Sequence, residues 1–318
     1  MAGGPKLDED AIIRRYFQRP AGPDVLVGIG DDGAITRLAG SERLVTAVDT
    51  LVAGVHFPAR TPPHAVGHRV LAVNLSDLAA MAARPRWATL SLSIPSADGA
   101  WVREFAAGFF ALARRHRVSL IGGDTVRGPL NVSVTALGSV APDREVRRTG
   151  ARPGDGVFVT GYPGEAVAGR LLLARRGRTG ALEKRFLYPQ PRVSIGRALA
   201  GVASAMIDVS DGLHHDLGKL LNASGVGADL EVPLLPLSRA LLGHCGVARA
   251  RRHALMGGDD YELAFTAGEE ESAIIGKIAS RNSCRITRIG TVSSRRGLRW
   301  RLDGQDWRVR DSTFAHFL

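Results

Sequence analysis

The chain has 318 residues, of which 45% are hydrophobic, and its net charge at neutral pH is +11. This length predicts two domains, and the composition allows each of them a full hydrophobic core. No apolar run is long enough to span a membrane, the N-terminus does not have the pattern of a signal peptide, and two cysteines in so long a chain are not a disulfide scaffold. We therefore expect a cytoplasmic protein in which Cys245 and Cys284 are free thiols.

The positive charge raises the alternative of a basic nucleic-acid-binding protein. Four of the 42 basic residues are lysines, and the arginines are spread along the chain instead of forming one tail or stripe. A positive surface also attracts phosphorylated small molecules. We therefore predict small-molecule partners, with neither nucleic acid nor membrane among them.

The first predicted elements lead into a loop that holds two carboxylates. Residues 8–18 have the periodicity of a short amphipathic helix, and residues 25–27 that of a short strand. The loop at 28–33 fits the G-x-G-x-x-G pattern, but Asp31 and Asp32 would repel a pyrophosphate, and the chain turns again too soon for the required helix. The same carboxylates would attract a divalent metal ion. A plain Asp-rich turn is an equally open alternative.

A second strand, residues 44–48, is predicted to end at Asp49, and His56 lies in the segment that follows. A lone histidine is more often packed or exposed than a ligand. Residues 65–83 are predicted to form a helix that is apolar on most of its surface and therefore buried. Asp77 interrupts this surface, and a buried carboxylate needs either an arginine or a metal ion as its partner.

A Gly-Gly-Asp motif follows the strand predicted for residues 118–121. Paired glycines let a backbone approach a ligand closely. Asp124 offers the hard oxygen that Mg²⁺ prefers, and Arg127, in the next turn, offers a fork that suits phosphate. With further strands predicted at 87–94 and 131–140, the first half of the chain is a mixed α/β unit.

The charged segment 141–154 contains proline and glycine, and we place a domain boundary there, which gives domains 1–148 and 149–318. Arg148 in this segment is either exposed linker surface or a phosphate ligand. The second half is predicted to be an α/β domain. Its expected elements are strands at 156–160, 205–209, 263–266 and 284–292, helices at 164–175, 194–203, 213–222 and 270–280, and a basic hairpin at 298–309.

Two further groups of polar residues lie in this second half. Asp208, Ser210 and Asp211 sit where a strand meets a helix, and they exceed what one helix N-cap requires, although one of them can still serve as the cap. Gly258 and Asp259 repeat the Gly-Gly-Asp pattern of the first half.

The aspartates form six stations, at the ends of apolar segments or within a buried helix. They are Asp31/Asp32, Asp49, Asp77, Asp124, Asp208/Asp211 and Asp259/Asp260. Carboxylates that converge raise one another's pKa unless cations neutralise them. Because Mg²⁺ takes one or two carboxylates beside substrate phosphates, so many carboxylates predict several metal ions and a polyphosphate. The sequence has neither a Walker A motif nor the H-R-D and D-F-G motifs of protein kinases.

Six motifs resemble those of the thiamine-monophosphate kinase family, in the family's order and over nearly the whole chain. They are Asp31-Asp32, Val48 to Phe57, Ala72 to Met81, Gly122 to Pro129, Ile207 to Gly212 and Gly258 to Leu263. The helix segment from Asn74 to Met81 and the Val55-His56-Phe57 segment separate this family from its relatives, the aminoimidazole ribonucleotide synthetase-like ATP enzymes.

The resemblance implies transfer of a phosphoryl group from ATP to thiamine monophosphate, giving thiamine diphosphate, with several Mg²⁺ ions as cofactors. It implies an α/β (α+β) protein with the two-domain aminoimidazole ribonucleotide synthetase-like fold. It also implies a homodimer in which the N-terminal mixed sheets pair into a barrel. Domain 1–148 would bind ATP and Mg²⁺ and make the dimer contact, and 149–318 would be the C-terminal α/β domain.

The resemblance also implies roles for single residues. The metal ligands would be Asp32, Asp49, Asp77, Asp124, Asp208 and Asp211. ATP would be contacted by Gly123, Asp124, Arg148 and Ser210, and thiamine phosphate by His56, Asp259 and Phe314. The catalytic role is assigned to Asp124, Asp211 and Arg148, because phosphoryl transfer needs positioning and charge neutralisation and no protein nucleophile. The attacking phosphate has a second pKa of about 6, so no strong base is required.

The sequence departs from the family at two places. Ala47 and Val48 stand where Thr or Ser is common, so a hydroxyl ligand is lost, although their backbone carbonyls could still coordinate metal. Asp259 stands in place of a glutamate and is one methylene shorter. The alternatives are another ATP-dependent enzyme of the same superfamily, the nucleic-acid-binding protein considered above, and a catalytically idle member of the family.

Overall fold

The computed structural model describes residues 8–29, 33–176 and 180–308. The chain divides into two compact units, one of residues 1–78 and 83–142 and the other of residues 79–82 and 143–318, and each is described by itself. In the part of the chain that the structure describes, no helix is long and apolar enough to cross a membrane.

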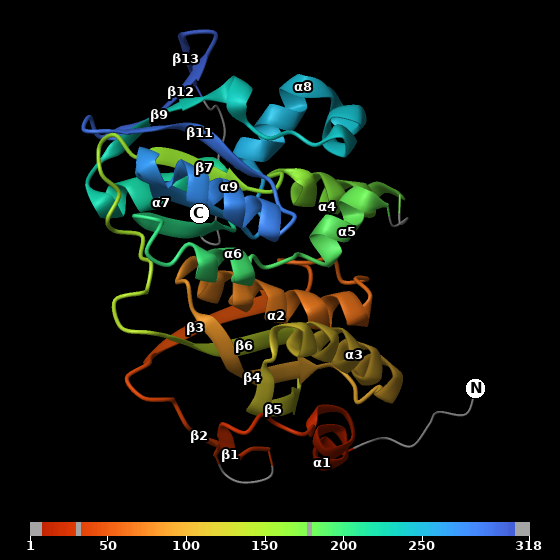
Figure 1. Ribbon diagram of the computed structural model, residues 1–318. Coiled ribbons are helices and arrows are strands. Elements are labelled where there is room, and N and C mark those ends of the chain that lie inside the picture. The colour runs from red at the N-terminus through yellow and green to blue at the C-terminus, as the bar shows by residue number, and fades with distance from the viewer. Residues whose placement is uncertain (1–7, 30–32, 177–179, 309–318) are drawn as a thin grey trace. The chain divides into compact units, whose positions relative to one another are not determined.

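The first unit is built on a four-stranded mixed sheet with the order β3-β6-β4-β5 (Figure 1). Its strands are β3 (Arg43–Val52), β4 (Arg84–Ile94), β5 (Ser119–Arg127) and β6 (Asn131–Val140). The β4–β5 pair is parallel, and the β3–β6 and β4–β6 pairs are antiparallel. Before the sheet come a short helical segment, α1 (Glu9–Ile12) and η1 (Ile13–Phe17), and the paired strands β1 (Val25–Val27) and β2 (Ile35–Thr36).

Two long helices, α2 (Pro63–Ala80) and α3 (Gly99–His116), pack closely against each other in this unit. A Cβ atom at Gly67 would lie 2.0 Å from the backbone oxygen of Phe105, and one at Gly108 would lie 1.9 Å from that of His64. Glycine is therefore required at both crossing points. As predicted, α2 is buried on most of its surface, and Asn74 and Ser76 are fully buried within it.

The opposite face of the same sheet carries exposed apolar side chains. Leu44, Val48 and Val126 are 50%, 63% and 46% exposed. The strand register from β3 through β6 and β4 to β5 places all three on one face. Alternation along a strand sends neighbouring residues to the other face, where α2 lies.

Two strands of this unit extend beyond the C-terminal ends that the sequence predicted. β3 continues to Val52, so Asp49 lies inside the strand and not at its end. β5 continues through the Gly-Gly-Asp motif to Arg127, because residues 122–127 pair regularly with residues 89–94 of β4. Backbone pairing has overridden the low strand propensity of the two glycines.

The second unit contains a seven-stranded sheet with the order β13-β12-β9-β11-β7-β10-β8. The strands are β7 (Gly156–Thr160), β8 (Ala205–Val209), β9 (Gly227–Glu231), β10 (Glu262–Ala267), β11 (Ile286–Ser293), β12 (Gly297–Leu302) and β13 (Gln305–Trp307). The helices are α4 (Glu165–Arg176), α5 (Ala181–Leu187), α6 (Val193–Ala198), α7 (Leu213–Ser224), α8 (Arg239–Met256) and α9 (Ser272–Arg281), with short 3₁₀ turns at Val232–Leu234 and Glu269–Glu271.

The main core of this unit lies between its sheet and α7. Leu213, Leu217 and Leu220 of α7 pack into one apolar cluster with Ile207 and Trp300. The sequence predicted β7, β8, α7 and the β12–β13 hairpin, and the structure confirms them. It also contains α5, α8 and β9, which the sequence analysis did not identify.

Candidate functional site

The Gly-Gly-Asp motif of the first unit borders a cavity of about 810 Å³. Gly122, Gly123 and Asp124 line it from β5, and Phe17 of the N-terminal helical segment lines it as well. The backbone of Gly123 lies directly against β4, since a Cβ atom there would be 1.9 Å from the oxygen of Leu90. The carboxylate of Asp124 is exposed, so it is available to a ligand in the cavity.

Asp49 lies next to helix α2. Its backbone N–H donates to Oδ1 of Asn74 at 3.0 Å, and Nδ2 of Asn74 donates to the oxygen of Val70 at 2.9 Å. The buried amide thus ties β3 to the helix that carries Asp77, three residues further on. Asp77 is half-buried, whereas the sequence predicted a buried carboxylate.

His56 closes a tight turn after β3. Its Nδ1 accepts the backbone N–H of Val52 at 3.0 Å. This contact fixes the neutral tautomer in which Nε2 carries the proton, so His56 can donate a hydrogen bond from Nε2.

The register of the sheet separates Asp49 from Asp124. Asp124 pairs with Ser91, Ser91 with Ser133, and Ser133 with Thr50. Asp124 therefore shares a face with Thr50, and Asp49 is on the opposite face, because successive residues alternate. One copy of this unit does not bring the two carboxylates together.

Ala47 and Val48 lie on β3, the outermost strand of the described sheet. In an antiparallel ladder, successive residues direct their carbonyls alternately toward and away from the partner strand. Only one of the two backbone carbonyls can therefore point away from β6. That a backbone carbonyl at these positions coordinates metal in place of the lost hydroxyl stays a prediction.

In the second unit, the loop between β8 and α7 is held by a carboxylate inside the helix. Oδ2 of Asp216 accepts the backbone N–H groups of Ser210, Asp211 and Gly212 at 3.0, 2.9 and 3.2 Å. The alternative that Asp208, Ser210 or Asp211 caps the helix does not hold: the N-cap is Gly212, and the carboxylate that accepts these N–H groups is that of Asp216. Burial raises the pKa of Asp216, while its contacts with Lys219 act in the opposite direction.

Lys219 joins two carboxylates of this loop. Its Nζ donates to Oδ2 of Asp211 at 2.6 Å and to Oδ1 of Asp216 at 3.0 Å. Partial burial acts to lower the pKa of Lys219, but the hydrogen bonds and charges of the two aspartates outweigh it and raise that pKa. Asp208, at the end of β8, is 5% exposed.

The Gly-Gly-Asp motif of the second unit lies beside the same loop. The backbone N–H of Asp259 donates to the oxygen of Ser210 at 2.8 Å, and that of Tyr261 donates to the oxygen of Val209 at 2.8 Å. A Cβ atom at Gly258 would lie 2.6 Å from the oxygen of Ser210. The structure therefore brings the backbones of Asp259 and Ser210 together, and their sharing of one site stays a prediction.

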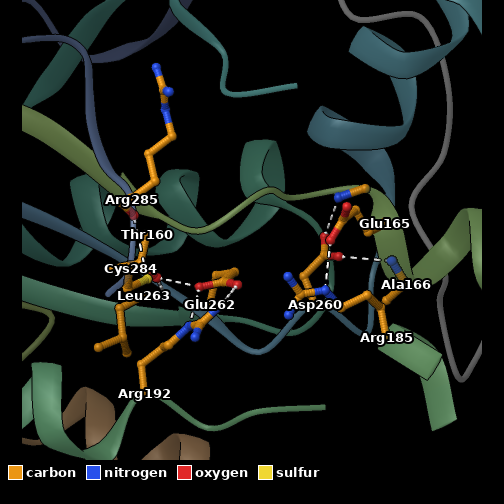
Figure 2. A network of polar contacts seen from close by, with 11 residues as sticks. Thr160, Glu165, Ala166, Arg185, Arg192, Asp260, Glu262, Leu263, Cys284 and Arg285 are labelled. Atoms are coloured by element: carbon orange, nitrogen blue, oxygen red, sulfur yellow. Dashed lines mark hydrogen bonds and ion pairs between the residues drawn. The ribbon is translucent and has the colours of Figure 1, made fainter. Parts of the chain in front are cut away.

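Asp259 and Tyr261 both have left-handed backbone conformations, with φ of 73° and 52°. Such conformations are unusual for residues other than glycine and persist where the surroundings impose them. Asp260 lies between them and Glu262 follows them, and Figure 2 shows the polar contacts that hold these two side chains. Asp260 accepts the N–H groups of Gly164 and Ala166 at 2.7 and 3.2 Å, at the start of α4. Burial raises the pKa of the Asp260 carboxyl well above its usual range.

Glu262 supplies the second support (Figure 2). Its carboxylate accepts from Thr160 Oγ1 at 2.5 Å and from Nε of Arg192 at 2.6 Å, and a second guanidinium nitrogen of Arg192 contacts the other oxygen. Burial acts to lower the pKa of Arg192, but the charge and hydrogen bonds of Glu262 raise it overall. Arg192 and Glu262 are thus a bidentate, largely buried ion pair.

Three predicted site residues are not placed in a site by the described structure. The side chain of Arg148 is exposed, while its backbone oxygen accepts from Ser224 Oγ at 2.9 Å. Asp32 and Phe314 lie outside the described residues, as does Asp31.

The donor chemistry of these positions suits a hard divalent cation. Within the described ranges, no three His, Cys, Asp or Glu side chains are grouped so as to hold a metal ion. Mg²⁺ needs fewer, since it binds one or two carboxylates and completes its shell with water and substrate phosphates. The exposed Asp124 and the half-exposed Asp211 fit that requirement, each in its own unit. The prediction that all six stations form one basin involves both units and stays a prediction.

Four residues that support the β8–α7 loop and the Asp259 turn were not recognised from the sequence as part of a site. Asp216 and Lys219 lie on the first turns of α7, and their signal was the i, i+3 spacing of opposite charges on one helix. Glu262 stood within a quoted motif, but nothing local to it identified Arg192, which is 70 residues away.

Comparison with known protein families identifies the domains of this chain. The chain matches the AIR synthase related protein N-terminal domain over residues 30–140 and the corresponding C-terminal domain over residues 152–303. These matches define the class: a two-domain α/β protein of the AIR synthase related type.

Within that class, named relatives are kinases. The chain is 42% identical to the thiamine-monophosphate kinase of Salmonella typhimurium, over 95% of this chain and 97% of that protein. The chain therefore belongs to the thiamine-monophosphate kinase family, a family of enzymes.

Solved structures give the same result. The thiamine-monophosphate kinase of Stenotrophomonas maltophilia superposes with a TM-score of 0.84 at 44% identity, covering 93% of this chain and 95% of that chain. AaThiL complexed with AMPPCP and TMP superposes with a TM-score of 0.78 at 33% identity, covering 91% and 92%.

Proposed function

We propose that this protein transfers the γ-phosphoryl group of ATP directly to thiamine monophosphate, producing ADP and thiamine diphosphate. One observation carries the proposal: a protein of the same fold, 33% identical over nearly the full length of both chains, binds AMPPCP together with TMP. The residues described above supply carboxylates, an arginine and a neutral histidine suited to those two ligands.

The proposed chemistry is in-line attack of a substrate phosphate oxygen on the γ-phosphorus. That oxygen is largely ionised near neutral pH, because a phosphomonoester has a second pKa of about 6. The protein therefore has to align the two phosphates and to offset their negative charge, and a strong general base is not required. Bound Mg²⁺ would neutralise the phosphate oxygens and lower the repulsion between the two anions.

Each residue has a proposed task. We assign Asp124 and Asp211, with Asp32, Asp49, Asp77 and Asp208, to holding Mg²⁺, and Gly123, Arg148 and Ser210 to the nucleotide. His56, Asp259 and Phe314 are assigned to thiamine monophosphate. The position of Gly123 in the lining of the cavity and the hydrogen bond from Asp259 to Ser210 support these assignments. A backbone without side chains can approach phosphates closely, and neighbouring loops can share one substrate.

We also propose that the active form is a homodimer joined through the sheet of the first unit. Leu44 and Val48 on β3 and Val126 on β5 are exposed apolar side chains on one face of that sheet. Exposed apolar patches on a sheet usually mark contact surfaces. Val48→Lys is expected to shift the mass from dimer to monomer in light scattering; a monomeric wild type would contradict the assignment.

The activity is tested by incubating the full-length protein with ATP, MgCl₂ and thiamine monophosphate and separating the products by chromatography. We expect thiamine diphosphate and ADP in equal amounts. ADP without thiamine diphosphate would favour another ATP-dependent enzyme of the superfamily, and neither product would contradict the proposal.

The role of Asp124 is tested with Asp124→Asn, which keeps the size of the side chain. Loss of this charge should lower kcat by about 100-fold or more, the size of effect seen when one electrostatic contact to a transition state is removed. Asp98→Asn is the matched control: Asp98 is exposed in the same unit and caps α3, and asparagine caps helices equally well. A wild-type rate for Asp124→Asn would remove Asp124 from the site.

A further inference from the structure

Helix α7 contains a lysine that belongs to neither the nucleotide nor the thiamine assignments. Lys219 lies two turns into α7, and its ammonium bridges Oδ2 of Asp211 and Oδ1 of Asp216 at 2.6 and 3.0 Å. The side chains of Lys219 and Asp211 are 36% and 40% exposed, but that of Asp216 is 1% exposed. One cation thus serves a buried carboxylate and a partly exposed one.

The two carboxylates differ in how tightly they are fixed. Oδ2 of Asp216 accepts three backbone N–H groups of the loop, and its Oδ1 accepts from Lys219. Removing the lysine from Asp216 would leave a buried carboxylate without a cation, which is strongly unfavourable. Asp211 is under no such constraint, because its carboxylate is partly exposed and water can replace the ammonium.

We propose that Lys219 is a positioning residue for Asp211. Its ammonium holds the Asp211 carboxylate in place and neutralises it while no divalent cation is bound, and it releases Asp211, but not Asp216, when the cation arrives. This inference rests on the proposed function in one respect, namely that Asp211 is a cation ligand.

The physical reason is competition between two cations for one carboxylate. An ammonium 2.6 Å from Oδ2 of Asp211 leaves little room for a second cation on the same oxygen, and it repels a divalent ion on the other oxygen. Occupation of Asp211 by Mg²⁺ therefore requires the Asp211–Lys219 contact to open. Lys219 reduces the affinity for Mg²⁺, and in return the loop is kept in one conformation before the cation binds.

The test is the Mg²⁺ dependence of thermal unfolding, measured with full-length protein, saturating AMPPCP and no thiamine monophosphate, so that no turnover occurs. Lys219→Met removes the ammonium and keeps the length of the side chain. We expect the Mg²⁺ concentration that gives half of the rise in melting temperature to fall about tenfold, a size set by the repulsion between neighbouring charges. Lys277→Met, at an exposed position of α9 in the same unit, removes the same charge and should leave that concentration unchanged.

A lower melting temperature of Lys219→Met without Mg²⁺ would not be diagnostic, because a purely structural lysine predicts it too. The diagnostic variant is Lys219→Met/Asp211→Asn, in which the gain in Mg²⁺ affinity should disappear, since the carboxylate that was released is gone. Lys219→Gln, which keeps a hydrogen-bond donor for Asp216, provides the same comparison if the methionine variant fails to fold.

An unchanged or higher half-saturating Mg²⁺ concentration in Lys219→Met would overturn the inference, as would a melting temperature of the wild type that does not respond to Mg²⁺. Weaker binding of AMPPCP by Lys219→Met, with unaltered Mg²⁺ dependence, would show that Lys219 binds phosphate instead. Formation of thiamine diphosphate by the wild type is measured separately, so failure of the proposed function is distinguished from failure of this inference.

Discussion

Gly122 and Gly123 are neighbours in one strand, but only one of them has a conformation that other residues avoid. Gly123 has a φ of 154°, and a Cβ atom there would collide with the backbone of Leu90. A Cβ atom at Gly122 would meet only a methyl group of Thr89, at 3.9 Å. The motif therefore contains one glycine that the fold requires and one that it does not.

Substitution by alanine should separate the two glycines. Gly123→Ala is expected to lower the free energy of unfolding by about 3 kcal/mol, because the strand must shift away from β4 to make room. Gly122→Ala serves as the control and should change it by less than about 1 kcal/mol. Urea denaturation of both variants measures the difference, and equal values would show that the contact with Leu90 does not limit the strand.

The buried ion pair of Arg192 and Glu262 can be compared with an exposed ion pair of the same unit, Arg288 and Glu269. Its side chains are 14% and 7% exposed, whereas those of the Arg288–Glu269 pair are 38% and 67% exposed. Removing one partner of a buried pair leaves an uncompensated charge in a poorly solvated place. Exposed pairs contribute little because water and salt screen them.

We therefore expect Glu262→Gln to lower the free energy of unfolding by about 3 kcal/mol, the cost of breaking a buried pair. Glu269→Gln should lower it by less than about 1 kcal/mol, as is typical of exposed pairs. Guanidinium chloride unfolding would mask this comparison through its ionic strength, so urea is the suitable denaturant. A small loss for Glu262→Gln would mean that the ion pair with Arg192 contributes little to stability.

At the scale of whole elements, the sequence predicted existence and type better than boundaries. α2 was identified because apolar residues cover most of its surface, and β8 because it is a short apolar run. The ends of β3 and β5 were placed too early, because glycine and aspartate have low strand propensity and only the partner strand shows that pairing continues. α8 was missed because of its weak periodicity and the glycine at position 246, where the helix is kinked.

Helix α3 carries a titratable group at its end that makes the element sensitive to pH. Burial, followed by the neighbouring charges of Arg115 and His68, lowers the pKa of His116 from 6.5 to about 4. A helix C-terminus favours the charged form of histidine, but here burial has the larger effect.

The sign of the pH effect follows from this shift. The folded pKa lies below the unfolded one, so the unfolded chain takes up the proton first as the pH falls. The stability that neutral His116 contributes is present above pH 6.5 and is lost as the pH falls toward about 4. Between about pH 7.5 and pH 5 the wild type should lose about 2 kcal/mol more than His116→Gln, by the linkage of pKa to stability. Urea denaturation at several pH values measures this, and parallel curves for the two proteins would contradict the shift.

At the scale of the whole molecule, candidate site residues lie in each of the two units, and only part of their arrangement could be predicted from sequence. The resemblance of six motifs was sufficient to identify the family, because motif order and spacing along the chain are visible in sequence. The separation of Asp49 and Asp124 on two faces of one sheet depends on strand register, which the sequence did not reveal. The support of the Asp259 turn by Arg192 depends on a contact across 70 residues, for which no local pattern exists.

A ligand that binds only the folded protein raises its stability, and this makes the whole molecule a reporter of the proposed substrates. MgCl₂ and AMPPCP together, at a free concentration of a hundred times the dissociation constant, should add about 2.7 kcal/mol to the free energy of unfolding. Excess EDTA should remove most of that gain if carboxylates hold the nucleotide through Mg²⁺. Asp124→Asn should reduce the gain, whereas Asp98→Asn should retain it.

A basic nucleic-acid-binding protein would respond differently. Its nucleotide affinity would fall steeply with salt, and neither EDTA nor the charge of Asp124 would change that affinity. A gain in stability that survives EDTA at constant ionic strength would therefore contradict Mg²⁺-dependent binding of the nucleotide.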